Sequence, residues 1–362
     1  MSEKATIENV KSDESIAIEK LFTQLSDLKE VPRVAIFSHK CPDPDAIGSM
    51  MGMRWFLKKV FNLESECFSE GPISHPQNLT MVNLLDPELK PVSQYSSEKY
   101  KYAILVDTVP QNAGVDPNQN VVFDLVIDHH KEVCPLEFEG LFVNLKAGSC
   151  AATVYHIIKE FDLSFKQDID LDIRVATALL AGICIDTEDL MSDDSTQYEF
   201  SAWSGLFDFR DSLVLKKIVH FERPKFWVER KASSITQADI SDGFGVVGMG
   251  IIPAKHRDII ADMSDEMSAW EDVHTSIAFA IVGGDRIEGS VRSSNSTLSV
   301  SKLCHDLGGK HGRGGGKLGK GAYLYELGGG GLEEDDDEDS RQKTWELFNE
   351  KERKRIFKIL NG

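Results

Sequence analysis

Short apolar runs alternate along this chain with longer segments whose hydrophobic residues recur at helical spacing. The runs VAIF, AILV and LVI end just before His39, Asp107 and Asp128. Such runs are typical of strands buried on both faces of a parallel sheet. Residues 46–60 instead repeat apolar positions every three or four residues, as a helix does. Strands that alternate with helices of this length predict βαβ units and an α/β fold with a parallel sheet.

The same patterns predict two α/β domains, the second smaller than the first, which suits a length of 362 residues. After about residue 204 the pattern becomes helical and polar, and Pro224 interrupts it. A second set of strand and helix patterns then begins near residue 232. We expect a helical extension at 1–30, the first α/β domain at 31–205, a helical connector at 206–231, the second domain at 232–331, and an acidic loop with a C-terminal helix at 332–362.

Composition narrows the class of protein. The formal net charge of -19 argues against a protein that coats long nucleic acid, because such proteins usually have a basic footprint. No apolar run reaches the roughly 18 residues that a membrane helix needs. The polar N-terminus and scattered cysteines lead us to expect a cytoplasmic protein with reduced thiols.

Four segments place acidic residues and histidines at the ends of apolar runs, and the carboxyl ends of parallel strands meet in one crevice. One Asp-x-Asp pair alone could be a helix cap, but four such segments in order favour a site. Asp-His-His is also difficult to bury without a ligand. Carboxylates with a few imidazoles suit Mn²⁺. The candidate ligands are His39, Asp43, Asp45, Asp107, Asp128, His129, His130 and Asp186.

A second candidate region is basic and rich in glycine. Between 301 and 320 the chain has five basic residues other than histidine against one acid, Asp306. Glycines let the backbone approach a phosphate, and successive N–H groups can form an anion nest. The alternative is a flexible Gly/Lys loop. Upstream, Arg292 in VRSS is a candidate phosphate clamp, with an exposed strand-end arginine as the alternative.

The four acidic segments resemble motifs I to IV of the DHH phosphoesterase superfamily, through the strings DPDAIGS and DHH. The second domain resembles the C-terminal substrate-binding domain of that superfamily, through VRSS and the glycine-rich stretch. The resemblance covers roughly 31–331 and is strongest to oligoribonucleases that also act as pAp phosphatases. Relatives usually place a histidine after the glycines, whereas here GRGGG precedes Lys317 and His311 comes earlier.

This resemblance implies two divalent metal ions, Mn²⁺ by preference. His39 and Asp43 would bind one ion, and Asp45, His129 and Asp186 the other. Asp107 would bridge both, and Asp128 would orient an imidazole from behind. His130, Arg292 and Lys317 would act on the substrate phosphate in catalysis, and further substrate contacts would come from Ser293, His311, Arg313, Gly314, Gly315 and Gly316.

The expected function is a two-metal phosphoesterase that hydrolyses phosphodiester or phosphomonoester bonds. Its substrates would be short oligonucleotides or small nucleotides, such as linear or cyclic dinucleotides or pAp, held between the domains. One alternative is an inorganic pyrophosphatase or exopolyphosphatase. Another is a non-catalytic nucleotide-binding regulator on the same scaffold. We expect no long nucleic acid or membrane partner, and a homodimer is a possible assembly.

Overall fold

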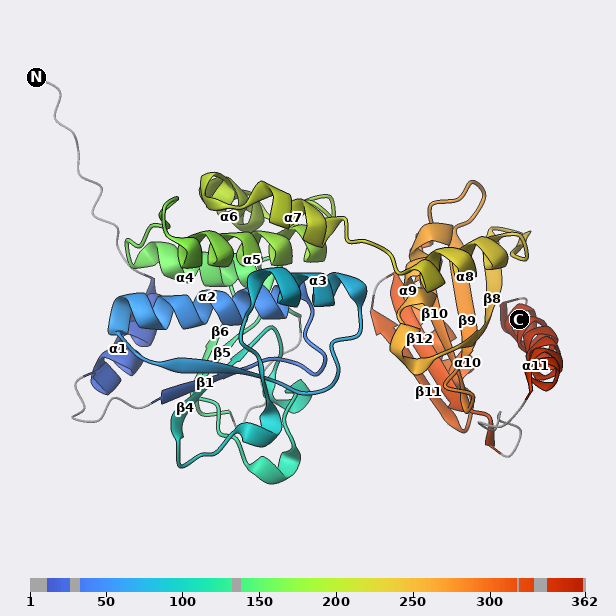
Figure 1. Ribbon diagram of the computed structural model, residues 1–362, viewed down its shortest axis with the longest axis horizontal. Coiled ribbons are helices and arrows are strands. Elements are labelled where there is room, and N and C mark those ends of the chain that lie inside the picture. The colour runs from blue at the N-terminus through green and yellow to red at the C-terminus, as the bar shows by residue number, and fades with distance from the viewer. Residues whose placement is uncertain (1–11, 27–32, 132–137, 318, 329–336, 361–362) are drawn as a thin grey trace, which may run out of the picture. The chain divides into compact units, whose positions relative to one another are not determined.

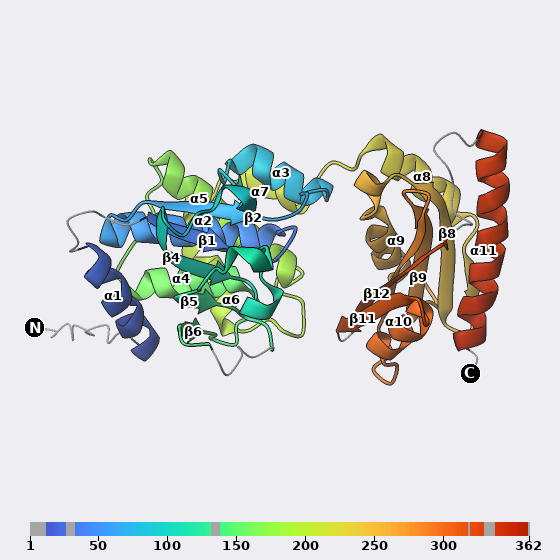
Figure 2. The same ribbon diagram turned by 90° about the horizontal axis from the view of Figure 1, so that it is seen from below.

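The computed structural model describes residues 12–26, 33–131, 138–317, 319–328 and 337–360. The chain divides into two compact units, Met1–Glu222 and Arg223–Gly362 (Figure 1; Figure 2 gives a second view). Each unit is described by itself. Among the helices of the described ranges, none is both long and apolar enough to cross a bilayer.

The first unit is built on a parallel sheet in the order β3-β2-β1-β4-β5-β6. The reversal of order around β1 and β4 makes this a doubly wound sheet, whose ligands bind outside the carboxyl ends of the strands. The strands are β1 (Arg33–Phe37), β2 (Ser65–Ser69), β3 (Lys90–Pro91), β4 (Tyr100–Val106), β5 (Leu125–Ile127) and β6 (Leu141–Val143).

Both faces of this sheet are buried, as the continuous apolar runs predict. Val34 and Ile104 face a core shared with helices, whereas their neighbours Ala35 and Leu105 face a second cluster rich in aromatic residues. Figure 1 shows α2, α4 and α5 covering one side of the sheet. The helices are α1 (Asp13–Ser26), α2 (Pro44–Phe61), α3 (Pro76–Leu85), α4 (Cys150–Glu160), α5 (Asp170–Asp186), α6 (Gln197–Leu206) and α7 (Ser212–Val219), with 3₁₀ turns η1 (Val92–Gln94), η2 (Pro110–Asn112), η3 (Pro117–Gln119) and η4 (Phe207–Phe209).

The second unit has a mixed sheet in the order β11-β12-β10-β9-β8-β7, in which only the β8–β9 pair is parallel. Its strands are β7 (Asp239–Ser241), β8 (Phe244–Ile252), β9 (Thr275–Val282), β10 (Arg286–Ser293), β11 (Gly312–Lys317) and β12 (Lys320–Glu326). Its helices are α8 (Lys225–Ile235), the 3₁₀ turn η5 (Ala254–His256), α9 (Ile259–Met267), α10 (Val300–Gly308) and α11 (Glu338–Leu360).

Alternate residues of β9 and β10 face opposite helix layers. Phe279 and Val291 lie in the core with α10 and α11. Ser276 and Ser290, which lie an odd number of positions from these residues, instead face α9, where Ser264 hydrogen-bonds to both strands. The α9 face of the sheet is therefore lined with small polar residues, which allows the helix to lie close to the strands.

The predicted fold class, a parallel-sheet α/β domain followed by a smaller α/β domain, is confirmed. The structure divides the predicted connector (206–231) between the units, at Glu222. Pro224 is the N-cap residue of α8, which packs on β8. The extension at 1–30 contributes α1, which buries Ile18 in the first core. Within 332–362, residues 332–336 of the acidic loop lie outside the described ranges, and α11 belongs to the second core.

The glycine-rich stretch is a strand, not the loop or anion nest that the sequence predicted. Gly312 to Lys317 form β11, paired along its length with β12. A Cβ atom on Gly314 would lie 1.9 Å from the carbonyl oxygen of Cys304 in α10. Close packing of α10 over the strand therefore accounts for this glycine without a ligand.

Candidate metal centre

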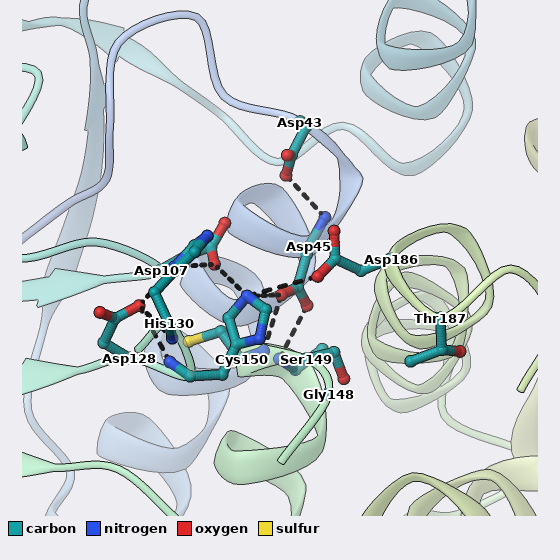
Figure 3. A network of polar contacts seen from close by, with 12 residues as sticks. Asp43, Asp45, Asp107, Asp128, His130, Gly148, Ser149, Cys150, Asp186 and Thr187 are labelled. Carbon is teal, nitrogen blue, oxygen red and sulfur yellow. Dashed lines mark hydrogen bonds and ion pairs between the residues drawn. The ribbon is translucent and has the colours of Figure 1, made fainter. Parts of the chain in front are cut away.

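The candidate ligands converge at the carboxyl edge of the first sheet, where Figure 3 shows Asp43, Asp45, Asp107, His130 and Asp186 around one space. They come from segments far apart in the chain: the turn after β1, the ends of β4 and β5, the first turn of α2 and the last residue of α5. Strand order brings these segments together, because β1, β4 and β5 are adjacent in the sheet.

Asp43 has two roles. Its Oδ1 atom caps α2, accepting hydrogen bonds from the backbone N–H groups of Asp45 (3.0 Å) and Ala46 (3.1 Å). Its Oδ2 atom lies 3.8 Å from Nε2 of His39. The capping interpretation and the metal interpretation of this residue are therefore compatible, because each uses a different oxygen.

Asp45 is buried, and the N-terminus of α4 holds it in place. Its Oδ2 accepts a hydrogen bond from the backbone N–H of Cys150 (2.7 Å), and its Oδ1 accepts one from Ala151 (2.8 Å). Sequence reasoning missed these two donors. The signal that could have found them is the Gly-Ser turn that opens α4, since the first N–H groups of a helix need outside acceptors and attract anions.

Asp107 lies between two histidines from different segments. Its Oδ2 is 3.4 Å from Nε2 of His39, and its Oδ1 is 3.3 Å from Nε2 of His129. Asp107 is buried, its Oδ1 atom has no hydrogen-bond partner among the described residues, and its backbone has φ 60°. An aspartate held in this left-handed conformation, with its two carboxylate oxygens near imidazoles of different ligand groups, is well placed to bridge two cations.

Asp128 lies behind the histidine pair. Its Oδ1 accepts a hydrogen bond from the Nδ1 atom of His130 at 2.8 Å and another from the backbone N–H of His129 at 2.9 Å. With Nδ1 as the donor, Nε2 of His130 is the ring nitrogen left for other contacts. Asn144 fixes the same turn by donating to the carbonyl oxygen of His130.

The residues form three overlapping groups of closely spaced ligand atoms. They are His39, Asp43 and Asp107; Asp45, His129 and Asp186; and Asp107, His129 and His130. The first two groups match the two ligand sets expected from the sequence, and Asp107 connects them. Each combines carboxylate oxygens with imidazole, the donor chemistry that suits Mn²⁺.

The charges of the site also fit two cations. Burial, together with the charges of Asp107 and Asp186, raises the pKa of Asp45 well above its usual range. Burial alone would lower the pKa of His39, but Asp107 and Asp43 outweigh it and raise the pKa to about 11. The pKa of His129 is raised in the same way, to about 10. Protons on these groups thus offset part of the negative charge of the clustered carboxylates. Divalent ions would offset that charge more completely, and they would compete with the protons for the same atoms.

The residues expected from the second domain lie in the second unit. Arg292 is near the carboxyl end of β10, where Nη2 donates to Asp265 Oδ2 at 3.1 Å and Nε donates to Oδ1 of the same carboxylate. Nη1 donates to Ser290 Oγ at 2.8 Å. Asp265 would therefore have to release Arg292 before this side chain could clamp a phosphate through two N–H groups. Ser293 hydrogen-bonds to Thr275 (2.8 Å), and His311 is exposed just before β11.

Residues 33–183 match a family model described as the DHH family, N-terminal domain. An uncharacterised protein of Methanocaldococcus jannaschii is 26% identical over 286 residues, 78% of this chain and 57% of that protein, so the chain spans little more than half of it. A probable manganese-dependent inorganic pyrophosphatase of Streptococcus agalactiae is 24% identical over 69% of this chain and 78% of its own length. The crystal structure of an exopolyphosphatase-related protein from Bacteroides fragilis has a TM-score of 0.65 at 15% identity, over 96% of this chain and 98% of that one.

The parallel sheet and the paired ligand sets define the first unit as an α/β domain with a candidate two-metal centre. The match to the DHH family model covers this domain, residues 33–183. Asp45, Asp107 and the Asp-His-His segment, which carry the family resemblance in the sequence, are the residues that the fold brings together.

We expect Asp128→Asn to lower turnover by about 10- to 100-fold while the metal content stays unchanged, because losing a partner that orients an active-site imidazole has effects of that size. Steady-state hydrolysis of a phosphodiester with Mn²⁺, alongside elemental analysis of the bound metal, measures both. Asp124→Asn is the matched control: its carboxylate accepts a backbone hydrogen bond from Ala103 and belongs to none of the ligand groups of the described residues, so the activity of this variant should not change. Native turnover in the Asp128 variant would remove this residue from the site.

Proposed function

We propose that the protein is a two-metal phosphoesterase acting on short oligonucleotides or small nucleotides. The observation that supports the reaction is the position of Asp107, whose two carboxylate oxygens face one histidine from each ligand set. Asp107 would therefore be the ligand that the two cations share.

When bound, two divalent ions polarise the phosphoryl group and lower the pKa of a coordinated water so that it is nucleophilic near neutral pH. The residues of the chain would then do three things. Asp45, anchored on the N-terminus of α4, keeps the second ligand set rigid. His130, oriented by Asp128 and partly exposed, presents Nε2 towards a phosphate oxygen. His39, at the end of β1, joins Asp43 and Asp107 in the first set.

Charge supports a short substrate. The chain has a net charge of -19, so a long nucleic acid would meet repulsion from every acidic surface within a Debye length, about 8 Å at physiological salt. Basic residues gather instead on one edge of the second sheet, where Arg292, Lys320 and Lys317 are paired across β10, β12 and β11. A few phosphates could contact these residues, with Asp265 displaced from Arg292.

Pyrophosphate or polyphosphate is the second candidate substrate. It is supported by the similarity to a probable manganese-dependent inorganic pyrophosphatase, which matches 69% of this chain. The paired ligand sets would suit hydrolysis of a phosphoanhydride as well as of an ester, because water attacks phosphorus in both reactions. The choice between the two depends on contacts with the leaving group.

A hydrolysis screen with Mn²⁺ tests the proposal, with pAp, a linear dinucleotide, a cyclic dinucleotide, pyrophosphate, polyphosphate and an RNA of about 20 nucleotides. We expect kcat/KM to be highest for a dinucleotide or pAp and to fall steeply with length. The salt dependence should be shallow, because few phosphate contacts release few counterions. Faster hydrolysis of pyrophosphate would establish the second candidate, and equal rates on the long RNA would indicate an exonuclease of long strands.

A further inference from the structure

A cavity of about 400 Å³ lies on the α9 side of the sheet in the second unit. It is lined by residues around the start of α9 and by three neighbouring strands, β10, β12 and β11. Because α9 packs on β9 and β10, the strands β12 and β11 extend past it, and Ala322 and Gly315 on them are exposed. The volume lies within the range of small-molecule pockets, roughly 300 to 1,000 Å³.

The floor of the cavity is flat because the strand register aligns three small residues. Ser290 of β10 pairs with Ala322 of β12, and Ala322 pairs with Gly315 of β11. Directly paired residues of antiparallel strands share a face of the sheet, so these three form one row across it. A Cβ atom on Gly315 would meet no atom within 4 Å. We call Ser290, Ala322 and Gly315 the small-residue row.

The next row towards the carboxyl end of β10 is entirely basic. Arg292 pairs with Lys320, and Lys320 pairs with Lys317. Residues two apart on a strand point to the same face, so this basic row borders the small-residue row on the same side of the sheet. Two residues of strand separate the rows by about 7 Å. Arg292 is paired with Asp265, so Lys317 and Lys320 add two positive charges beside that ion pair in a chain that is strongly acidic overall.

Two arginines line the cavity from either side. Arg257, just before α9, donates from Nε (2.9 Å) and Nη2 (2.6 Å) to the buried carboxylate of Glu288, which fixes its guanidinium in place. Arg313 lies across the sheet on β11 and forms no ion pair within the described residues. Guanidinium planes stack readily on flat rings, and Arg313 is free to do so.

We propose that this cavity binds the base of a nucleotide. The ring would lie on the small-residue row between Arg257 and Arg313, and the phosphate would contact the basic row. This inference rests on the proposed function and deepens it, because a contact with the base would distinguish nucleotides from pyrophosphate. Pyrophosphate and polyphosphate carry no ring, so they would use the basic row and leave the flat floor empty.

Calorimetric binding to the full chain, with metal removed by chelation, tests the base contact apart from catalysis. The probes are adenosine monophosphate, ribose 5-phosphate and inorganic phosphate. Stacking on a side chain contributes roughly 5- to 150-fold per base, so adenosine monophosphate should bind at least about fivefold more tightly than ribose 5-phosphate. Ala322→Phe, which fills the floor from an exposed strand position, should abolish that difference. Arg313→Ala should reduce it, and both should leave ribose 5-phosphate binding unchanged.

Glu326→Phe is the matched control, since it places the same ring on the same strand and face but outside the cavity lining. It should keep the preference for adenosine monophosphate. Equal affinities of the native chain for adenosine monophosphate and ribose 5-phosphate would overturn the inference, as would a preference that survives Ala322→Phe. These outcomes are independent of turnover: a chain that binds the base but hydrolyses no nucleotide would contradict the proposed function and leave the base site standing.

Discussion

Replacing Asp107 by Asn should reduce turnover by well over 100-fold, the largest functional effect that we expect from a single substitution. Losing a residue that only orients a metal ligand already lowers activity or metal affinity by about 10- to 100-fold. Asp107 belongs to two of the three ligand groups, so its loss should cost more. Asparagine keeps the shape of the side chain and tolerates the positive φ of this position, so the fold should remain. Steady-state kinetics with Mn²⁺ measures the loss.

The metal dependence of stability gives a second measurement for Asp107. A ligand that binds only the folded state at 100 times its Kd stabilises it by about 2.7 kcal/mol, so Mn²⁺ should raise the Tm of the native chain. That rise should shrink in the variant. His156→Ala is the control, because the ring of His156 hydrogen-bonds to the carbonyl oxygen of Tyr198 and belongs to none of the ligand groups. An Asp107 variant with a tenth of native activity would refute the bridging role.

Replacing Glu352 by Ala should destabilise the second unit by about 3 to 5 kcal/mol, the cost of leaving one partner of a buried ion pair alone. Glu352 is 1% exposed on α11. Its carboxylate accepts hydrogen bonds from the hydroxyls of Tyr323 (2.9 Å) and Tyr325 (2.7 Å) and from the guanidinium of Arg355 (2.7 and 2.8 Å). Without this carboxylate, the buried hydroxyl of Tyr323 and the guanidinium of Arg355 lose a hydrogen-bond partner. Helix α11 also loses these hydrogen bonds to β12.

Thermal unfolding followed by circular dichroism measures this effect, and a fall in Tm on the order of 10 °C is expected for a unit of this size. Glu350→Ala is the matched control on the same helix: its carboxylate pairs only with the exposed Lys354 among the described residues, so Tm should not change. Glu352→Gln, which keeps the shape and one acceptor, should fall between the two. Equal Tm values for the Ala variants at 350 and 352 would show that the network adds no stability.

The α/β class and the ligand set could be predicted from the sequence for a local reason. Buried parallel strands require continuous apolar runs, and the hydrophilic residues that end these runs must lie at the edge of the sheet. Asp107 and Asp128 follow such runs directly and His39 follows one after a single serine, so their convergence depends only on the strands being adjacent. Asp186 also closes an apolar run, but this run belongs to the helix α5 and not to a strand.

The glycine-rich stretch shows where local patterns fail. Six residues with four glycines have little intrinsic preference for a strand, and the sequence favoured a loop. Pairing with β12 and the close approach of α10 made the stretch a strand, because glycine alone fits beneath the carbonyl of Cys304. The same pairing aligned Lys317 with Lys320 and Gly315 with Ala322, which spacing along the chain does not reveal.

The sequence by itself determined the type of fold and the kind of metal ligand, because these depend on residue types and periodicities within short segments. Only the tertiary structure decided which atoms meet. Asp45 contacts the N–H of a residue 105 positions away, and the two oxygens of Asp107 separate towards two histidines. The rows of the second sheet likewise exist only through strand register. Contacts of this kind join residues that are far apart in the sequence. The order and register of the strands determine all of these contacts at once.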